Sequence, residues 1–223
     1  MARDMAAERR ASAGGWAVWI VLTALAELLG VGLGAVWWVG ADRLNPEPTG
    51  FPSQLAMLAL KALSGVVEGA VLGVVQASLM RRRLPGLSIR RWSLATCAVA
   101  VAGWAVGSSF SVFGGGGTGG GFDPEPLLTV ALAAGFGLAV GTLFGGVQAL
   151  ALGGLGVRRW PWVIGNAAGW ALGLPAIYLA ASGASAGPVW LLGAGGGLIA
   201  GAVVGLATAL AFAAMTRRSA AHH

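Results

Sequence analysis

The sequence has little charge, a single cysteine and almost no histidine, and each shortage excludes a class of protein. Charged residues make up 10% of the 223 residues, whereas soluble domains are usually about a quarter charged. Cys97 is the only cysteine, so the chain has neither an internal disulfide nor a cysteine-rich metal site. The two histidines, His222 and His223, end the sequence, so no apolar segment carries a histidine that could ligate haem. We therefore expect no cofactor and no metal.

Arrangements of residues that perform catalysis are also missing. The sequence has no nucleophile paired with a histidine, no hydrolase-like pair of carboxylates and no cluster of metal ligands. The glycine run 114–121 does not match a phosphate-binding loop, which needs a Lys followed by Ser or Thr at the start of a helix. We interpret this run as a flexible linker outside the membrane. We predict that the protein is not an enzyme.

The chain has long apolar runs instead. Hydrophobic residues make up 57% of it and the mean hydropathy is +0.78, and apolar runs of about 20 residues are typical of membrane-spanning helices. We predict an all-α integral membrane protein with a cytoplasmic segment (1–15), one transmembrane domain (16–215) and a cytoplasmic tail (216–223). Six helices are expected near 16–40, 54–80, 92–113, 127–153, 160–181 and 188–215.

The basic residues predict the orientation. Twelve of the fourteen Lys and Arg residues lie in four segments that a six-helix chain places on one side of the membrane. They are Arg3, Arg9 and Arg10; Arg81, Arg82, Arg83, Arg90 and Arg91; Arg158 and Arg159; and Arg217 and Arg218. Because such clusters remain in the cytoplasm, we predict that both termini face the cytoplasm, in a bacterial inner membrane. No basic groove with interleaved aromatics is present, so we expect no nucleic-acid partner.

A short pattern of small and polar residues recurs in three of the predicted helices. Its copies are Gly69, Gly73 and Gln76; Gly141, Gly145 and Gln148; and Gly201, Gly205 and Thr208. Pairs of small residues four apart let helix backbones approach closely in lipid, and a polar side chain beside them forms hydrogen bonds between helices. We expect the six glycines to be helix-packing positions.

The other three helices share a second pattern. Gly103, Trp104 and Gly107 match Gly169, Trp170 and Gly173, and the aligned stretch of the first helix contains Ala26, Glu27 and Gly30. The chain thus consists of three helical hairpins (16–80, 92–153 and 160–215). Repeats of the same orientation are related by an axis along the membrane normal, so we predict a pseudo-threefold bundle.

These two patterns resemble those of a loose group of uncharacterised bacterial multi-span membrane proteins with G-x-x-x-G-x-x-Q and G-W-A-x-G hairpins. The resemblance implies no activity. Six spans in three hairpins is also the plan of mitochondrial carriers, but their P-x-[DE]-x-x-[KR] signature is absent, so that likeness concerns architecture alone.

Five polar residues are expected near one level of the inner leaflet. They are Gln76, Gln148, Thr208, Thr23 and Asn166. They could form a polar ring around a vestibule, or they could join helices through hydrogen bonds of about 0.6–2 kcal/mol each. The neighbouring glycines favour the second interpretation.

Three charged residues within the predicted spans are the less common signal. Glu27 lies about 16 Å beyond Trp16, and Glu68 about 18 Å from the inner end of its helix, so both are expected near the midplane. Lys61 lies about 10 Å further out than Glu68 on the same helix face. At the Glu68 position the other hairpins have Val140 and Ala200. The charged first hairpin is therefore either a working site or a structural ion pair.

Tryptophans are expected mainly at the two membrane interfaces. Those near the inner ends of the helices are Trp16, Trp19, Trp92, Trp160 and Trp162, and those near the outer ends are Trp37, Trp38 and Trp190. Trp104 and Trp170 instead lie at mid-membrane depth, where they either pack in the core with a bonded indole N–H or form a stacking platform for a ligand.

Two function classes follow from these features. The first is transport or binding of a small solute, an ion or protons through the charged first hairpin, and six-span binding subunits of vitamin importers offer an analogy of fold alone. The second is a non-catalytic accessory subunit that packs into a larger membrane complex. The expected partners are the lipid bilayer, other membrane subunits or a second copy of the chain, and a small-molecule or ion substrate.

Overall fold

The computed structural model describes residues 2–114, 125–182 and 188–216, with side chains from residue 15 onward except at 189, and helices are the regular secondary structure of this part of the chain. The helices are α1 (Ala2–Leu44), α2 (Phe51–Ala62), α3 (Ser64–Met80), α4 (Ile89–Phe113), α5 (Pro126–Ala151), α6 (Trp160–Ser182) and α7 (Val189–Thr216). Six stretches are long and apolar enough to cross a membrane. The prediction of an all-α chain with six such helices is therefore confirmed. Most of the glycine run 114–121 lies outside the described residues.

The second predicted span is interrupted, which the sequence did not reveal. α2 ends at Ala62 and α3 begins at Ser64, although together they form one membrane-length stretch, Phe51–Met80. At the break the Ser64 hydroxyl donates to the Lys61 carbonyl at 2.7 Å, and Val66 N donates to Leu63 O at 3.0 Å. A side chain that bonds to the backbone in this way competes with the regular helical ladder. The break separates Lys61 from Glu68.

The helix ends follow from local chemistry. Ser88 precedes α4, and its hydroxyl accepts a hydrogen bond from Arg91 N, as an N-cap residue does. Pro126 occupies the first turn of α5, where its missing N–H costs nothing. Gly50 has a φ of 77° just before α2, a conformation that favours glycine.

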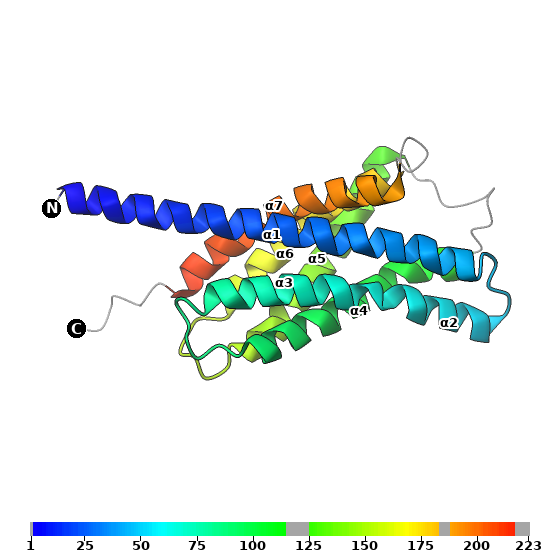
Figure 1. Ribbon diagram of the computed structural model, residues 1–223, viewed down its shortest axis with the longest axis horizontal. Helices are drawn as coiled ribbons and strands as arrows, with labels where there is room; N and C mark the ends of the chain where they lie inside the picture. The colour runs from blue at the N-terminus through cyan, green and yellow to red at the C-terminus, as the bar shows by residue number, and fades with distance from the viewer. Residues whose placement is uncertain (1, 115–124, 183–187, 217–223) are drawn as a thin grey trace.

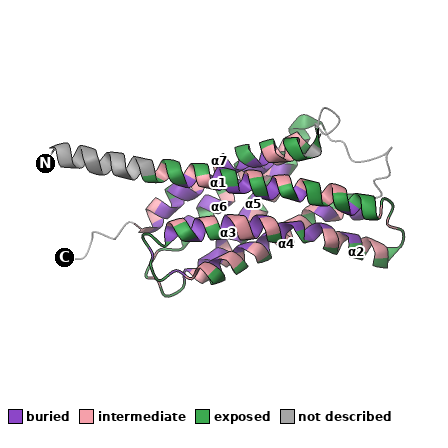
Figure 2. Ribbon diagram, viewed as in Figure 1, coloured by how far each residue is buried: buried purple, intermediate pink, exposed green. Residues whose placement is uncertain are grey.

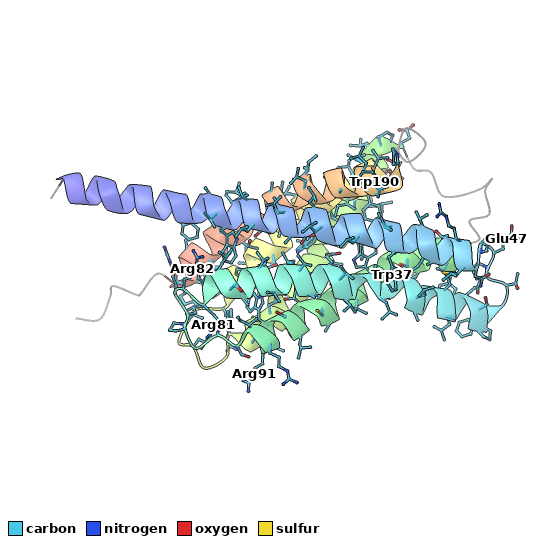
Figure 3. The ribbon with its side chains drawn as sticks, in the orientation of Figure 1. Trp37, Glu47, Arg81, Arg82, Arg91 and Trp190 are labelled. Atoms are coloured by element: carbon cyan, nitrogen blue, oxygen red, sulfur yellow. The ribbon has the colours of Figure 1, made fainter. Side chains whose placement is uncertain are left out.

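The spans form a closed ring in chain order. α1 contacts both α3 and α7, and the ring continues through the contacts α3–α4, α4–α5, α5–α6 and α6–α7. The start of α1, the connections 81–88 and 152–159 and the end of α7 lie at one end of the bundle, and the connection 45–50 lies at the other (Figure 1). Arg81, Arg82 and Arg91 are at the first of these ends and Glu47 is at the opposite end (Figure 3).

The outer surface of the bundle is apolar and its interior carries polar groups. Figure 2 shows buried residues on the inward faces of the helices and exposed residues on the outward faces. On α1 the exposed residues Val21, Leu25, Leu29 and Leu33 repeat every four positions, so they share one face. An apolar surface of this extent on a helical bundle fits a lipid environment.

The repeated glycines lie where the helices approach most closely. A methyl group added at Gly69 would lie 2.5 Å from Cys97 Cα on α4. At Gly141 it would lie 2.4 Å from the Asn166 carbonyl oxygen on α6, and at Gly201 2.6 Å from Glu27 Cβ on α1. Contacts this close require glycine. The three contacts belong to three different helix pairs, α3–α4, α5–α6 and α7–α1.

The remaining motif glycines make similar contacts, and a third glycine extends each motif. Added methyl groups would lie 2.8 Å from Ser93 Cα at Gly73, 2.5 Å from Val163 Cα at Gly145 and 3.1 Å from Ile20 Cα at Gly205. Four residues before each motif lie Gly65, Gly137 and Gly197, and each would also meet the backbone of the facing helix within 2.6 Å. The sequence analysis did not single out these three as packing positions, although the spacing of four residues continues through them.

Candidate functional site

Glu27 is the most isolated polar group in the described part of the chain. It lies on the face of α1 that packs against α7, with the α-carbon of Gly201 opposite its side chain. Its exposed fraction is 0%, and neither carboxyl oxygen has a hydrogen-bond partner among the described residues. The hydroxyl of Thr23, one turn earlier on α1, is also buried and without a partner there. Buried polar atoms are nearly always hydrogen-bonded, so these exceptions require an explanation.

Glu68 lies on α3 close to Glu27. Its side chain packs on Gly30 of α1, where an added methyl group would lie 2.9 Å from Glu68 Cγ. Its carboxylate accepts a hydrogen bond from the Trp104 indole N–H of α4. Gly30 comes three residues after Glu27 on α1, so Glu27 and Glu68 lie within about one helical turn of each other along α1. The structure therefore brings two of the three predicted charged residues together between α1, α3 and α4.

Lys61 does not join this pair. Its ammonium group pairs with Asp42 at the outer end of α1, with an Nζ–Oδ1 distance of 2.7 Å, and lies 4.5 Å from the centre of the Trp38 ring. The sequence allowed an ion pair between Lys61 and a glutamate, but in the structure Lys61 pairs with Asp42. The reason is geometric, because Lys61 lies on α2, which is in contact with α1, and Asp42 lies near the C-terminal end of α1. Asp42 was not singled out from the sequence.

The five residues of the predicted polar ring do not meet in one ring. Gln148 Nε2 donates to Thr96 Oγ1 at 2.9 Å and to Gln76 Oε1 at 3.3 Å. Its Oε1 accepts from Trp162 Nε1 at 2.9 Å. This group joins α3, α4, α5 and α6. All four of its members have an exposed fraction of 1% or less: Gln76, Thr96, Gln148 and Trp162.

The other members of the ring are separate from this group. Thr208 of α7 accepts from Trp19 Nε1 of α1 at 3.1 Å. Asn166 donates to the Trp162 carbonyl of its own helix at 2.9 Å, and Thr23 has no partner among the described residues. Side-chain hydrogen bonds therefore join α1 to α7 and link α3, α4, α5 and α6. Thr96 was not singled out from the sequence, and Trp19 and Trp162 were expected at the membrane interface.

Three of the tryptophans assigned to the inner interface lie inside the bundle instead. Trp19, Trp92 and Trp162 are exposed by 3%, 0% and 0%. The Trp162 ring packs edge-on against Trp19 at 6.2 Å and against Trp92 at 5.3 Å between ring centres. The prediction that these three line a membrane interface is wrong, because their rings point into the ring of helices and fill its inner end. Trp160, by contrast, is 55% exposed.

The two mid-membrane tryptophans have different environments. Trp104 donates to Glu68 and contacts Trp38 edge-on at 5.5 Å. Trp170 stacks on Phe144 at 5.4 Å, and its indole N–H has no partner among the described residues. The repeat explains the difference, since the Glu68 position of the second hairpin is Val140, which accepts no hydrogen bond.

The chemistry of this site is that of two interacting carboxyl groups in a buried place. Within the described residues no group of three or more His, Cys, Asp or Glu side chains could hold a metal ion. Comparison with known proteins adds no assignment, because no family model, no curated protein and no solved structure matches the chain.

Proposed function

We propose that the protein is a small membrane transporter, or the ion- or solute-binding component of one, in which Glu27 and Glu68 form the working site. The observation that carries this proposal is the burial of both carboxyl groups, with no hydrogen-bond partner for either oxygen of Glu27 among the described residues. A charged side chain at the bilayer centre costs at least about 2.5–3.5 kcal/mol on insertion scales, so such residues usually serve a function. Packing alone would be better served by the Val or Ala that the other hairpins carry at the Glu68 position.

The architecture that we propose for it is a pseudo-threefold bundle of three hairpins of the same orientation. The close glycine contacts between helices (α3–α4, α5–α6 and α7–α1) each join the second helix of one hairpin to the first helix of the next. Each contact has the same three-glycine pattern. The arginine-bearing connections and the start of α1 share one end of the bundle (Figure 3). By the positive-inside rule this end is cytoplasmic, with both termini there and with the protein in a bacterial inner membrane.

A second candidate function is an accessory subunit of a membrane complex. It is favoured by the aromatic packing at the inner end, where Trp19, Trp92 and Trp162 fill the centre of the bundle. In that case the carboxyl groups would serve assembly rather than transport. The two functions differ in whether the purified chain moves a solute or ion by itself.

Reconstitution into proteoliposomes tests the proposal. An applied pH gradient or membrane potential should produce a flux of protons, or of a coupled ion or solute, that empty liposomes lack. Glu68→Gln and Glu27→Gln should abolish it, whereas Glu47→Gln, a change in an exposed connection, should leave it intact. A flux that survives both buried substitutions, or the absence of any flux from folded wild-type protein, would favour the accessory role.

A further inference from the structure

The unpartnered carboxyl group of Glu27 points to a missing ligand. Both of its oxygens are buried without a donor among the described residues, as is the hydroxyl of Thr23 one turn away. Glu68 differs, because its carboxylate already accepts the Trp104 N–H. The Glu68 carboxylate therefore has a hydrogen-bond donor, whereas the Glu27 carboxyl group needs either a proton or a cation.

The space around Glu27 favours a very small ligand. On the α7 side, added methyl groups at Gly197 and Gly201 would lie 2.6 Å from the Glu27 carbonyl oxygen and 2.6 Å from Glu27 Cβ. On the α3 side, Gly30 is in similarly close contact with Glu68. Contacts this close bring the α1–α7 and α1–α3 backbones together at the pair, whereas the sites of organic solutes usually need about 300 Å³ or more.

Few side-chain oxygens near the pair are free to bind a divalent cation. Hard cations such as Mg²⁺ and Ca²⁺ take about six or more oxygen ligands. Apart from the oxygens of Glu27, the buried side-chain oxygens without a partner among the described residues are those of Thr23, one turn away on α1, and Ser93 on α4.

Among the described residues, no cationic side chain is paired with either carboxyl group. On α7, Gly197 and Gly201 lie against Glu27, and neither can titrate. α3 contributes Glu68, and α4 contributes the Trp104 N–H. Cys97, also on α4, packs with its backbone against Gly69, one residue beyond Glu68. The lysine of α2 is held by Asp42 at the outer end. Two negative charges in this place would repel each other without compensation.

We propose that the ligand of this site is a single proton shared by Glu27 and Glu68. The proposal rests on the function proposed above, and it names the transported or coupling species as H⁺. A proton from water adds to the Glu27 carboxylate and forms an O–H bond, and no other covalent bond changes. The neutral acid no longer repels the Glu68 carboxylate, which keeps the Trp104 N–H as its donor. The pair falls from two negative charges to one, as two close carboxyl groups that share a proton do.

Infrared spectroscopy of the purified full-length protein in detergent tests this assignment. A protonated carboxyl group has a C=O absorption that is separate from that of carboxylate and that shifts in D₂O. We expect the wild type to show this band at neutral pH and to lose it as the pH is raised. Glu27→Gln should remove the band, Glu68→Gln should shift its frequency because the neighbouring negative charge is lost, and the exposed control Glu47→Gln should leave it unchanged.

Folding is checked by circular dichroism and gel filtration of each variant. If Glu27→Gln does not fold, the pH titration of the wild-type band remains as the test. A folded wild type without a neutral-pH band, or with a band that Glu27→Gln retains, overturns the proposal. Loss of the band on addition of Na⁺ or K⁺ at constant pH also overturns it, in favour of a metal cation. A titrating band without flux in proteoliposomes supports the shared proton while it refutes transport, so the two failures are distinguishable.

Discussion

The close approach of α5 and α6 predicts a large effect from a single methyl group at Gly141. In Gly141→Ala the new Cβ would lie 2.4 Å from the Asn166 carbonyl oxygen, 2.9 Å from Asn166 C and 2.9 Å from Ala167 Cα. All three atoms belong to the backbone of α6, so no side-chain rotation relieves the clash. Carbon atoms normally pack about 3.5–4.0 Å apart, so the two helices must separate by about 1 Å.

The magnitude follows from packing energetics. Extra atoms in a well-packed interior typically cost about 1–3 kcal/mol. Alanine also favours a helix over glycine by about 0.8–1 kcal/mol, which partly hides the loss. Gly146→Ala is a matched control on the same helix, because a methyl group there meets no atom within 4 Å. The difference between the two variants cancels the propensity term and should be about 1–3 kcal/mol, roughly a 5- to 140-fold change in the unfolding constant.

Reversible unfolding in mixed micelles of mild detergent and dodecyl sulfate measures this difference. Helix content by circular dichroism reports the transition, and the two variants are compared in the same lipid and detergent. Gly141→Ala should unfold at a lower fraction of dodecyl sulfate than the wild type, and Gly146→Ala at the same fraction or a higher one. Equal stabilities of the two alanine variants would refute the assignment of Gly141 to a backbone contact.

Two further predictions concern topology and the outer ion pair. In a Cys97→Ala background, Thr49→Cys should react with an impermeant thiol reagent in intact cells and Pro85→Cys should not, because basic connections stay in the cytoplasm; labelling of Pro85→Cys alone would mean the opposite orientation. Asp42→Asn should lower the stability in detergent by about 1–3 kcal/mol, since it leaves the buried Lys61 ammonium without its carboxylate. Adding Lys61→Met to that variant should recover most of the loss, and no recovery would show that the pair contributes little.

The positions of the glycines and of the charged hairpin could be predicted from the sequence because they are repetitive or rare. Gly69, Gly141 and Gly201 stand at equivalent places in three repeats, and each lies at a close helix contact. Glu27 and Glu68 were expected near one depth because helical rise converts residue number into distance, and Glu68 packs on Gly30, three residues after Glu27. The break at Leu63 was not predicted, because no proline lies there and a Ser–Gly pair such as Ser64–Gly65 does not always break a helix: α4 continues through Gly107 and Ser108.

The sequence by itself determined the number of membrane-length helices and the clustering of arginines at alternate connections, because apolar length and local composition decide both. Only the tertiary structure decided which side chains meet. Trp19 bonds to Thr208, which is 189 residues away, because α1 closes the ring against α7. Lys61 pairs with Asp42 rather than with a glutamate because α2 is in contact with α1, and Asp42 lies near the C-terminal end of α1. Such partners depend on which helix faces meet across the ring, and no periodicity within one helix contains that information.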